Sequence, residues 1–283
     1  RDLDQVKGEV RKLVQSLPAA GVLVAAACEP NVADVVAGAP CRVIRYAVDG
    51  EGDAEVRARA LEATRTGTRF DLVREGVVVA RPEAPLHGRH NVANALAAIA
   101  VLESRGVPTG EILAALPRYT GVKRRQEVRG EAHGVTVIDD FAHHPTAVRE
   151  TLLSLRARYP GRRVIAVFEP RSNTSRRAVF QQDYAGAFGD ADRVIVSEVP
   201  DTPIYSATGE VTERFSSRQL ASDLRDRGEA AVAIDGVDAI VDHLVGLHAP
   251  GDVVVTLSNG AFGAIWEKLL DRLGAVALEA DPV

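Results

Sequence analysis

The sequence predicts an α/β protein of two domains, the second built on a mostly parallel sheet. From residue 134 onward, short apolar runs alternate with amphipathic segments, the pattern of a parallel sheet covered by helices on both faces. The 283 residues exceed the usual size of one domain. An apolar content of 46% is enough to fill two modest cores.

The first predicted domain covers residues 1–121 and mixes helices with strands. Apolar residues recur every three or four positions in the first segment, which Pro18 ends. Glu75-Gly76 is typical of a tight hairpin turn, whereas the polar stretch 49–66 carries no clear element. The predicted elements are a helix over 3–17, strands over 21–27 and 42–48 with a short helix after Pro30 between them, a hairpin over 68–82, a helix over 91–104, and a helix that Thr109 caps and Pro117 breaks.

The second predicted domain covers residues 122–283, and residues 120–127 are interpreted as the crossing between the two. Strands and helices should alternate through it. The predicted strands are 134–140, 163–169, 193–198, 230–235 and 252–258, and the predicted helices start at Pro145, Ser175, Ser216, Val237 and Phe262. In open sheets of this kind, ligands bind at the loops that follow the carboxyl ends of the strands.

Composition excludes several classes of function. The 34 basic and 39 acidic residues give a net charge of −5 without a basic block, so neither nucleic acid nor an anionic membrane is expected as a partner. No apolar run reaches membrane-spanning length, and five of the first ten residues are charged, which favours a cytoplasmic protein. Two cysteines are too few for a disulfide framework. Because methionine is absent, even at residue 1, we expect the chain to be part of a longer protein.

The first strand-end loop contains two acids and two imidazoles: Asp139, Asp140, His143 and His144. Such a cluster is compatible with a metal site, with acid/base catalysis, or with recognition of ribose, phosphate and amine groups. No third histidine or cysteine lies nearby in the sequence, so we assign no metal ligand within the chain. Pro145 then opens the next helix.

Two later loops and one helix start carry further candidates. Guanidinium groups beside a helix start suit carboxylate or phosphate binding, although exposed arginines next to a helix cap would look the same. Small residues allow close approach of backbone amides, or make an ordinary turn. Amide side chains one helical turn apart can bind an adenine edge, or simply cap the helix. These candidates are Arg171, Ser172, Asn173, Thr174 and Arg176; Ser258, Asn259 and Gly260; and His90, Asn91 and Asn94.

Five segments, taken in order, resemble the motif series of the Mur ligases: HGRHNVANALAAI, GVKRRQE, DDFAHHPTAV, FEPRSNTSRR and LSNGAFGAIWEKLL. The similarity covers nearly the whole chain. The DD-aromatic-x-HHPT pattern is shared with the muramate–alanine ligases, but the FEPRSNT and SNG loops are more similar to the murein peptide ligases. This resemblance implies part of a central ATPase domain followed by a Rossmann-like carboxyl-terminal domain.

The resemblance also implies an activity. It predicts an ATP- and magnesium-dependent ligase that joins UDP-N-acetylmuramate to L-alanyl-γ-D-glutamyl-meso-diaminopimelate through an acyl phosphate, in peptidoglycan recycling. Arg124, Arg125 and His143 would be catalytic; His90, Asn91, Asn94, Asp139 and Asp140 would bind the nucleotide; His144, residues 171–174, Arg176 and residues 258–260 would bind the substrates. Cationic groups suit this chemistry because charge develops on the phosphoryl group and on the tetrahedral intermediate.

One departure from the family pattern shapes these expectations. Mur ligases carry a Gly-Lys-Thr phosphate loop, and no G-x-x-x-x-G-K-[ST] occurs in this sequence. We therefore expect the phosphate loop, most magnesium ligands and the UDP-sugar domain upstream, and we expect the chain alone to be inactive. The sequence leaves two alternatives to a tripeptide ligase: a ligase for free L-alanine, and a non-catalytic module that binds a peptide or nucleotide.

Overall fold

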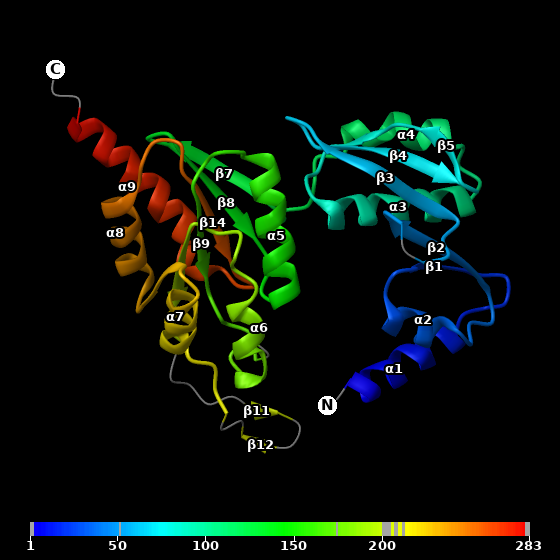
Figure 1. Ribbon diagram of the computed structural model, residues 1–283, viewed down its shortest axis with the longest axis horizontal. Helices are drawn as coiled ribbons and strands as arrows, with labels where there is room; N and C mark the ends of the chain where they lie inside the picture. The colour runs from blue at the N-terminus through cyan, green and yellow to red at the C-terminus, as the bar shows by residue number, and fades with distance from the viewer. Residues whose placement is uncertain are drawn as a thin grey trace. The chain divides into compact units, whose positions relative to one another are not determined.

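A computed structural model describes residues 3–50, 52–173, 175–199, 205–206, 209–210 and 213–280. The chain divides into two units, Arg1–Thr120 and Gly121–Val283. Both units combine helices with sheets rich in parallel strands, so the predicted α/β class is confirmed (Figure 1). Within the described residues, no helix is long and apolar enough to cross a membrane.

The first unit is a sheet in the order β1-β2-β3-β4-β5, with β6 paired to β4. Strands β1 to β3 are parallel, whereas β3, β4 and β5 are antiparallel neighbours. Helix α3 packs against β1, β2 and β3, and α1 packs against α2. The elements are α1 (Leu3–Gln15), β1 (Val22–Ala26), α2 (Pro30–Val36), β2 (Arg42–Val48), β3 (Val56–Ala63), β4 (Thr68–Arg74), β5 (Val77–Ala80), β6 (Glu83–Ala84), α3 (Arg89–Ser104) and α4 (Thr109–Ala115).

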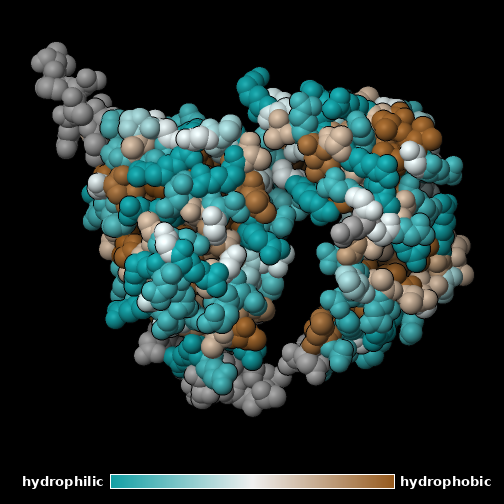
Figure 2. All heavy atoms as spheres, in the orientation of Figure 1, coloured by the Kyte–Doolittle hydropathy of each residue, from teal (hydrophilic) through white to brown (hydrophobic). Residues whose placement is uncertain are grey.

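The surface of the first unit shows where its core ends. Phe70, Leu72 and Leu96 are fully buried between the sheet and α3. By contrast, the valines of the edge strand β5, residues 77–79, are each more than half exposed. Figure 2 shows mostly hydrophilic surface on this side of the chain, with hydrophobic residues gathered over the end of the first unit that carries β5.

The second unit has a six-stranded sheet in the order β13-β10-β9-β14-β8-β7. All neighbours are parallel except β7, which runs antiparallel to β8 at the edge. A separate pair, β11 and β12, is antiparallel. The elements are β7 (Glu127–Ala132), β8 (Val135–Asp140), α5 (Pro145–Arg158), β9 (Val164–Phe168), α6 (Gln181–Ala185), β10 (Arg193–Ser197), β11 (Tyr205–Ser206), β12 (Gly209–Glu210), α7 (Ser217–Asp226), β13 (Ala230–Ile234), α8 (Val237–Leu247), β14 (Val253–Leu257) and α9 (Ile265–Ala280).

Helices cover both faces of this sheet because successive strand residues point to opposite sides. Ala166 and Phe168 of β9 pack in one core with α5, α6 and α7. Ile165 and Val167 pack in the other core with α8 and α9. Strands buried on both faces must be apolar throughout, which explains the continuous hydrophobic runs in the sequence.

Four local predictions require correction. Strand β3 occupies the polar stretch for which no element was predicted. A polar residue can lie in this strand because Arg57 is buried with its guanidinium donating to the carbonyls of Asp49 and Gly52. Strand β7 was also missed, since edge strands do not need a continuous apolar run. Pro108 is the residue that precedes α4, and Thr109 donates instead to Glu103, 2.6 Å away. No helix starts at Ser175; a short 3₁₀ turn at Ala178–Phe180 leads into α6.

Candidate functional site

Three adjacent strand ends bring the predicted loops of the second unit together. Strands β9, β14 and β8 are neighbouring and parallel, and Phe168, Leu257 and Asp140 stand in register at their last positions. The loops that follow therefore leave the sheet at one edge, the usual place for ligands in open α/β sheets. We call this edge the rim, made by residues 139–144, 169–173, 175–176 and 258–261 together with 124–127, which contact it.

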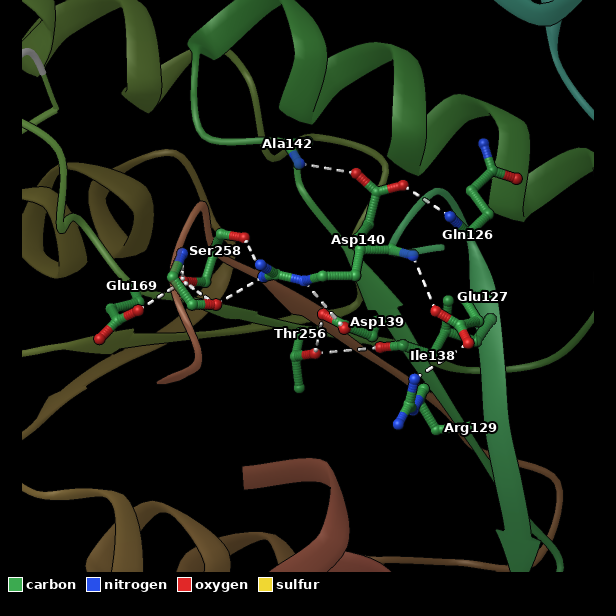
Figure 3. A network of polar contacts seen from close by, with 12 residues as sticks. Gln126, Glu127, Arg129, Ile138, Asp139, Asp140, Ala142, Glu169, Thr256 and Ser258 are labelled. Carbon is green, nitrogen blue, oxygen red and sulfur yellow. Dashed lines mark hydrogen bonds and ion pairs between the residues drawn. The ribbon is translucent and has the colours of Figure 1, made fainter. Parts of the chain in front are cut away.

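Figure 3 shows the polar network at the rim, with Asp139, Asp140 and Ser258 labelled. Arg124 bonds to Asp139 and to the loop that contains Ser258. Its Nε donates to the Oδ2 of Asp139 at 3.2 Å. Its Nη2 donates to the carbonyl oxygens of Ser258, at 2.7 Å, and Gly260, at 2.5 Å. The Asp139 side chain is only 7% exposed, which strengthens the ion pair relative to one in water. One guanidinium thus joins the end of β8 to the loop after β14.

Asp140 turns inward and organises the backbone around it. Its Oδ1 accepts from the amide of Ala142 at 2.7 Å, and its Oδ2 accepts from the amide of Gln126 at 2.8 Å. Burial raises the pKa of Asp140 above its ordinary value of 3.8, while these hydrogen bonds act in the opposite direction. Asp140 therefore fixes the crossing segment to the strand end. A contact of Asp139 or Asp140 with ribose stays a prediction.

The loops after β9 and β14 contact each other directly. The Ser258 hydroxyl donates to the carboxylate of Glu169 and accepts from the amide of Gly260 at 2.9 Å. The side chain of Arg171 lies against Gly260 so closely that a Cβ at position 260 would overlap it. Glu169 was not among the predicted site residues; its position as the first residue after β9 was the available signal. The carbonyl oxygen of Asn259, Oδ1, is buried and has no partner among the described residues.

The two histidines of the first loop face different surroundings. His143 is half-buried, and its Nδ1 lies 3.0 Å from the carbonyl oxygen of Phe141, so Nδ1 carries the proton and Nε2 has a free lone pair in the neutral ring. Its own carbonyl accepts from the hydroxyl of Tyr184. His144 is exposed and meets the ring of Phe180 edge-on at 4.8 Å. His143 is thus the more firmly held of the two.

Arg125 differs from its neighbour Arg124. Its side chain is exposed, and its guanidinium carbon lies 5.3 Å from the ring centre of Phe141. A cation over an aromatic face at this distance is weakly attracted and stays accessible to a ligand. The structure therefore separates the two adjacent arginines into one engaged by the rim and one open to solvent.

The loop after β9 does not open a helix, contrary to prediction. The Ser172 hydroxyl accepts from the amide of Ser175 at 2.9 Å and so holds a local turn. Arg171 and Asn173 are exposed, and Arg176 is half-buried. The predicted binding residue Thr174 lies outside the described residues. Any anion binding here would depend on side chains instead of a helix terminus.

The predicted adenine-binding residues lie in the first unit, at the start of α3. His90 is half-buried and Asn94 is exposed on the next turn. The Nδ2 of Asn91 donates to the carbonyl of His87 at 2.8 Å, so part of its amide holds the helix start. The exposed amide of Asn94 offers the donor and acceptor that an adenine edge requires. Among the described residues, no group of three or more metal-ligating side chains occurs.

Comparison with known proteins decides the family. The model of the Mur ligase middle domain matches residues 1–102, and that of the Mur ligase glutamate ligase domain matches residues 124–260. The chain belongs to the Mur ligase family. Members of this family are ATP-dependent ligases that form carbon–nitrogen bonds. The predicted resemblance is confirmed at the level of the family.

Individual relatives include two acceptor types. The UDP-N-acetylmuramate–L-alanine ligase of Geotalea uraniireducens is 32% identical over 96% of this chain and 58% of its own. The UDP-N-acetylmuramate–L-alanyl-γ-D-glutamyl-meso-2,6-diaminoheptandioate ligase of Haemophilus influenzae is also 32% identical, over 96% of this chain and 56% of its own. The crystal structure of a murein peptide ligase from Psychrobacter arcticus superposes with a TM-score of 0.68 at 28% identity, over 96% of this chain and 55% of its own. The chain thus spans little more than half the length of these relatives.

Proposed function

We propose that the protein containing this chain is an ATP-dependent ligase that joins UDP-N-acetylmuramate to L-alanyl-γ-D-glutamyl-meso-diaminopimelate. The observation that carries the proposal is the contact between the loops after β9 and β14, where Arg171 lies against Gly260 and Glu169 accepts from Ser258. These two loops are the segments that resemble the murein peptide ligases most. Their contact forms one surface with an exposed guanidinium, which suits a peptide that carries several carboxylates.

The chain's own residues would divide the work between the two units. In the first, His90, Asn91 and Asn94 would bind the adenine. In the second, Asp139 or Asp140 would approach the ribose. Of the two arginines predicted to be catalytic, the exposed Arg125 would stabilise charge on the transferring phosphoryl group, whereas the guanidinium of Arg124 is already bonded to oxygens of the rim. The remaining predicted rim residues would hold the peptide: His143, His144, Arg171, Ser172, Asn173, Thr174, Arg176, Ser258, Asn259 and Gly260.

The chemistry explains why cations and a free imidazole are needed. ATP supplies the phosphoryl group that turns a poor carboxylate electrophile into an acyl phosphate. The incoming amine must lose a proton as it attacks, and the free Nε2 of His143 is a suitable acceptor.

The test is an acceptor comparison on the complete gene product. Purified protein would receive ATP, magnesium and UDP-N-acetylmuramate with either the tripeptide or L-alanine, and the release of ADP would be followed. We expect kcat/KM for the tripeptide to exceed that for L-alanine by at least about a hundredfold, which is within reach of a site that pairs buried or partly buried polar groups with its substrate. A preference for L-alanine would refute the proposal.

A ligase for L-alanine is the second candidate, and one observation favours it. The L-alanine ligase of Geotalea uraniireducens matches this chain at the same 32% identity as the tripeptide ligase of Haemophilus influenzae. Overall identity therefore does not separate the two acceptors. The substitution Arg171→Ala helps to distinguish a tripeptide ligase from an L-alanine ligase. If Arg171 binds a carboxylate that the tripeptide has and L-alanine lacks, the substitution should raise the KM for the tripeptide strongly.

A further inference from the structure

The two adjacent arginines of the crossing segment differ in what they contact. The guanidinium carbons of both lie 5.3 Å from the ring centre of Phe141. Arg124 also binds three backbone or carboxylate oxygens, whereas Arg125 is exposed. We propose that Arg124 is a positioning residue that seats Arg171 through Gly260 and thereby sets the affinity for the acceptor. The part concerning the acceptor rests on the proposed function, but the part concerning the loop does not.

Arg124 is held at its backbone and at its guanidinium group. Its backbone lies in the left-handed region, with φ of 60°, which costs energy in a residue that has a Cβ. Two hydrogen bonds hold that conformation: its amide donates to the Oε2 of Glu127 at 2.7 Å, and its carbonyl accepts from Phe141 at 2.8 Å. At the other end the guanidinium meets Asp139, whose Oδ1 lies 3.4 Å from the hydroxyl of Thr256. Backbone strain of this kind persists only where the surroundings enforce it.

The guanidinium of Arg124 then fixes the loop after β14. It binds the carbonyls of Ser258 and Gly260, two residues apart, so it bridges the turn between them. The amides of the same two residues are also held, that of Ser258 by the carbonyl of Asp140 at 3.1 Å and that of Gly260 by the Ser258 hydroxyl. Hydrogen bonds to a charged donor are roughly twice as strong as neutral ones. The two bonds from Arg124 therefore add a strong restraint to this turn.

The last step leads from the turn to Arg171. The Nη1, Cδ and Cζ atoms of Arg171 occupy the space that a Cβ of residue 260 would fill. Glycine is needed here because a side chain approaches its backbone, and the restraint on Gly260 therefore sets how closely Arg171 can lie. The order of contact is Asp139, Arg124, Gly260, Arg171. In this way a residue at the crossing segment controls a residue that faces the proposed acceptor.

The first experiment measures the loop itself, in the 283-residue chain, by amide hydrogen exchange of residues 258–261. Arg124→Asn removes the guanidinium but tolerates the left-handed backbone. Arg124→Lys keeps the charge but cannot bind all three oxygens at once. We expect exchange to be about tenfold faster in the Asn variant and intermediate in the Lys variant, because charge-assisted hydrogen bonds are lost. Arg149→Lys, on the exposed face of α5, is the matched control and should leave exchange unchanged.

The outcome that overturns the proposal is unchanged exchange of residues 258–261 in Arg124→Asn while the thermal unfolding curve remains cooperative. If the variant does not fold, Arg124→Lys carries the same test. Gly260→Ala gives an independent check, since it keeps the carbonyl that Arg124 binds and displaces only Arg171. Crystals of that variant with Arg171 in its original place would also contradict the proposal.

The second experiment separates this inference from the proposed function, using acceptor kinetics of the complete gene product. Arg124→Lys should raise the acceptor KM about tenfold with kcat changed by less than about twofold, because a displaced binding group weakens ground-state and transition-state binding alike. If Arg171→Ala raises KM and Arg124→Lys does not, the inference fails and the function stands. If neither substitution raises KM although the loop exchanges faster, the assignment of Arg171 to the acceptor fails instead.

Discussion

The start of α3 and the rim of the second unit are both sites of predicted ligand contact, but they are built differently. At α3, Asn91 and Asn94 are one helical turn apart, so the helix alone places them on one face. At the rim, Asp139, Arg171 and Gly260 come from the ends of three strands far apart in the sequence. A site made within one helix should tolerate change at single positions, whereas a site made by several loops depends on the groups that tie them together.

The rim also carries more polar groups that are out of reach of water. Asp139, Asp140 and Ser258 are each buried, and each is hydrogen-bonded. Removing one partner from a buried pair leaves the other unsatisfied, which costs more than the bond itself contributed. The difference between the two regions therefore predicts a graded series of mutational effects.

The largest effect is expected from Asp140→Ala, which leaves the buried amides of Gln126 and Ala142 without acceptors. We expect the free energy of unfolding of the second unit to fall by about 2–4 kcal/mol. Urea unfolding followed by circular dichroism measures it. Asp226→Ala, an exposed change at the end of α7, should stay within about 0.5 kcal/mol and serves as the control. Equal losses in both variants would show that the rim is not specially sensitive.

The same carboxyl predicts a pH dependence. Burial raises the pKa of Asp140, so the folded chain keeps its proton to a higher pH than the unfolded chain does. Its contribution to stability is complete below pH 3.8 and is lost as the pH rises through the raised pKa. The unfolding free energy of wild type minus that of Asp140→Asn should therefore decrease over this window, by at most about 1.4 kcal/mol per pH unit. An increase with pH would contradict the assignment.

A smaller loss is expected from Ser258→Ala, which removes one donor to Glu169 and one acceptor for Gly260. The unfolding free energy should fall by about 1–2 kcal/mol, because the side chain is buried and both partners lose a bond. Residues 258–261 should also exchange faster than in wild type. Ser258→Thr keeps the hydroxyl and, if the added methyl group is accommodated, should restore most of the exchange protection.

The smallest effect on stability is expected at α3. Asn94→Ala removes an exposed amide, so the unfolding free energy should change by less than about 0.5 kcal/mol. Under the proposed function, binding of ATP by the complete gene product should nevertheless weaken, which isothermal titration calorimetry measures. Asn91→Ala should cost more stability than Asn94→Ala, because its amide also donates to His87. A larger loss of stability in Asn94→Ala than in Asn91→Ala would contradict this expectation.

The sequence by itself determined the features that depend on local pattern. Continuous apolar runs identified the strands buried on both faces, such as β9 and β14, and Glu75-Gly76 identified the turn between β4 and β5, where both residues have positive φ. Polar residues that follow such strands were expected at one edge, since parallel strands share a direction. That expectation needs only that the strands are parallel, which the alternation of apolar runs with amphipathic segments indicates.

Only the tertiary structure decided which of those polar residues form hydrogen bonds with other parts of the protein. The sequence treated Arg124 and Arg125 alike and left Asp139 and Asp140 undistinguished, yet the structure pairs Arg124 with Asp139 and turns Asp140 toward two backbone amides. Glu169 directly follows β9 in the sequence, but only the structure showed that it accepts from Ser258. The physical reason is that a hydrogen bond depends on distances of a few tenths of an ångström between segments up to 136 residues apart, and residue order does not encode these distances locally.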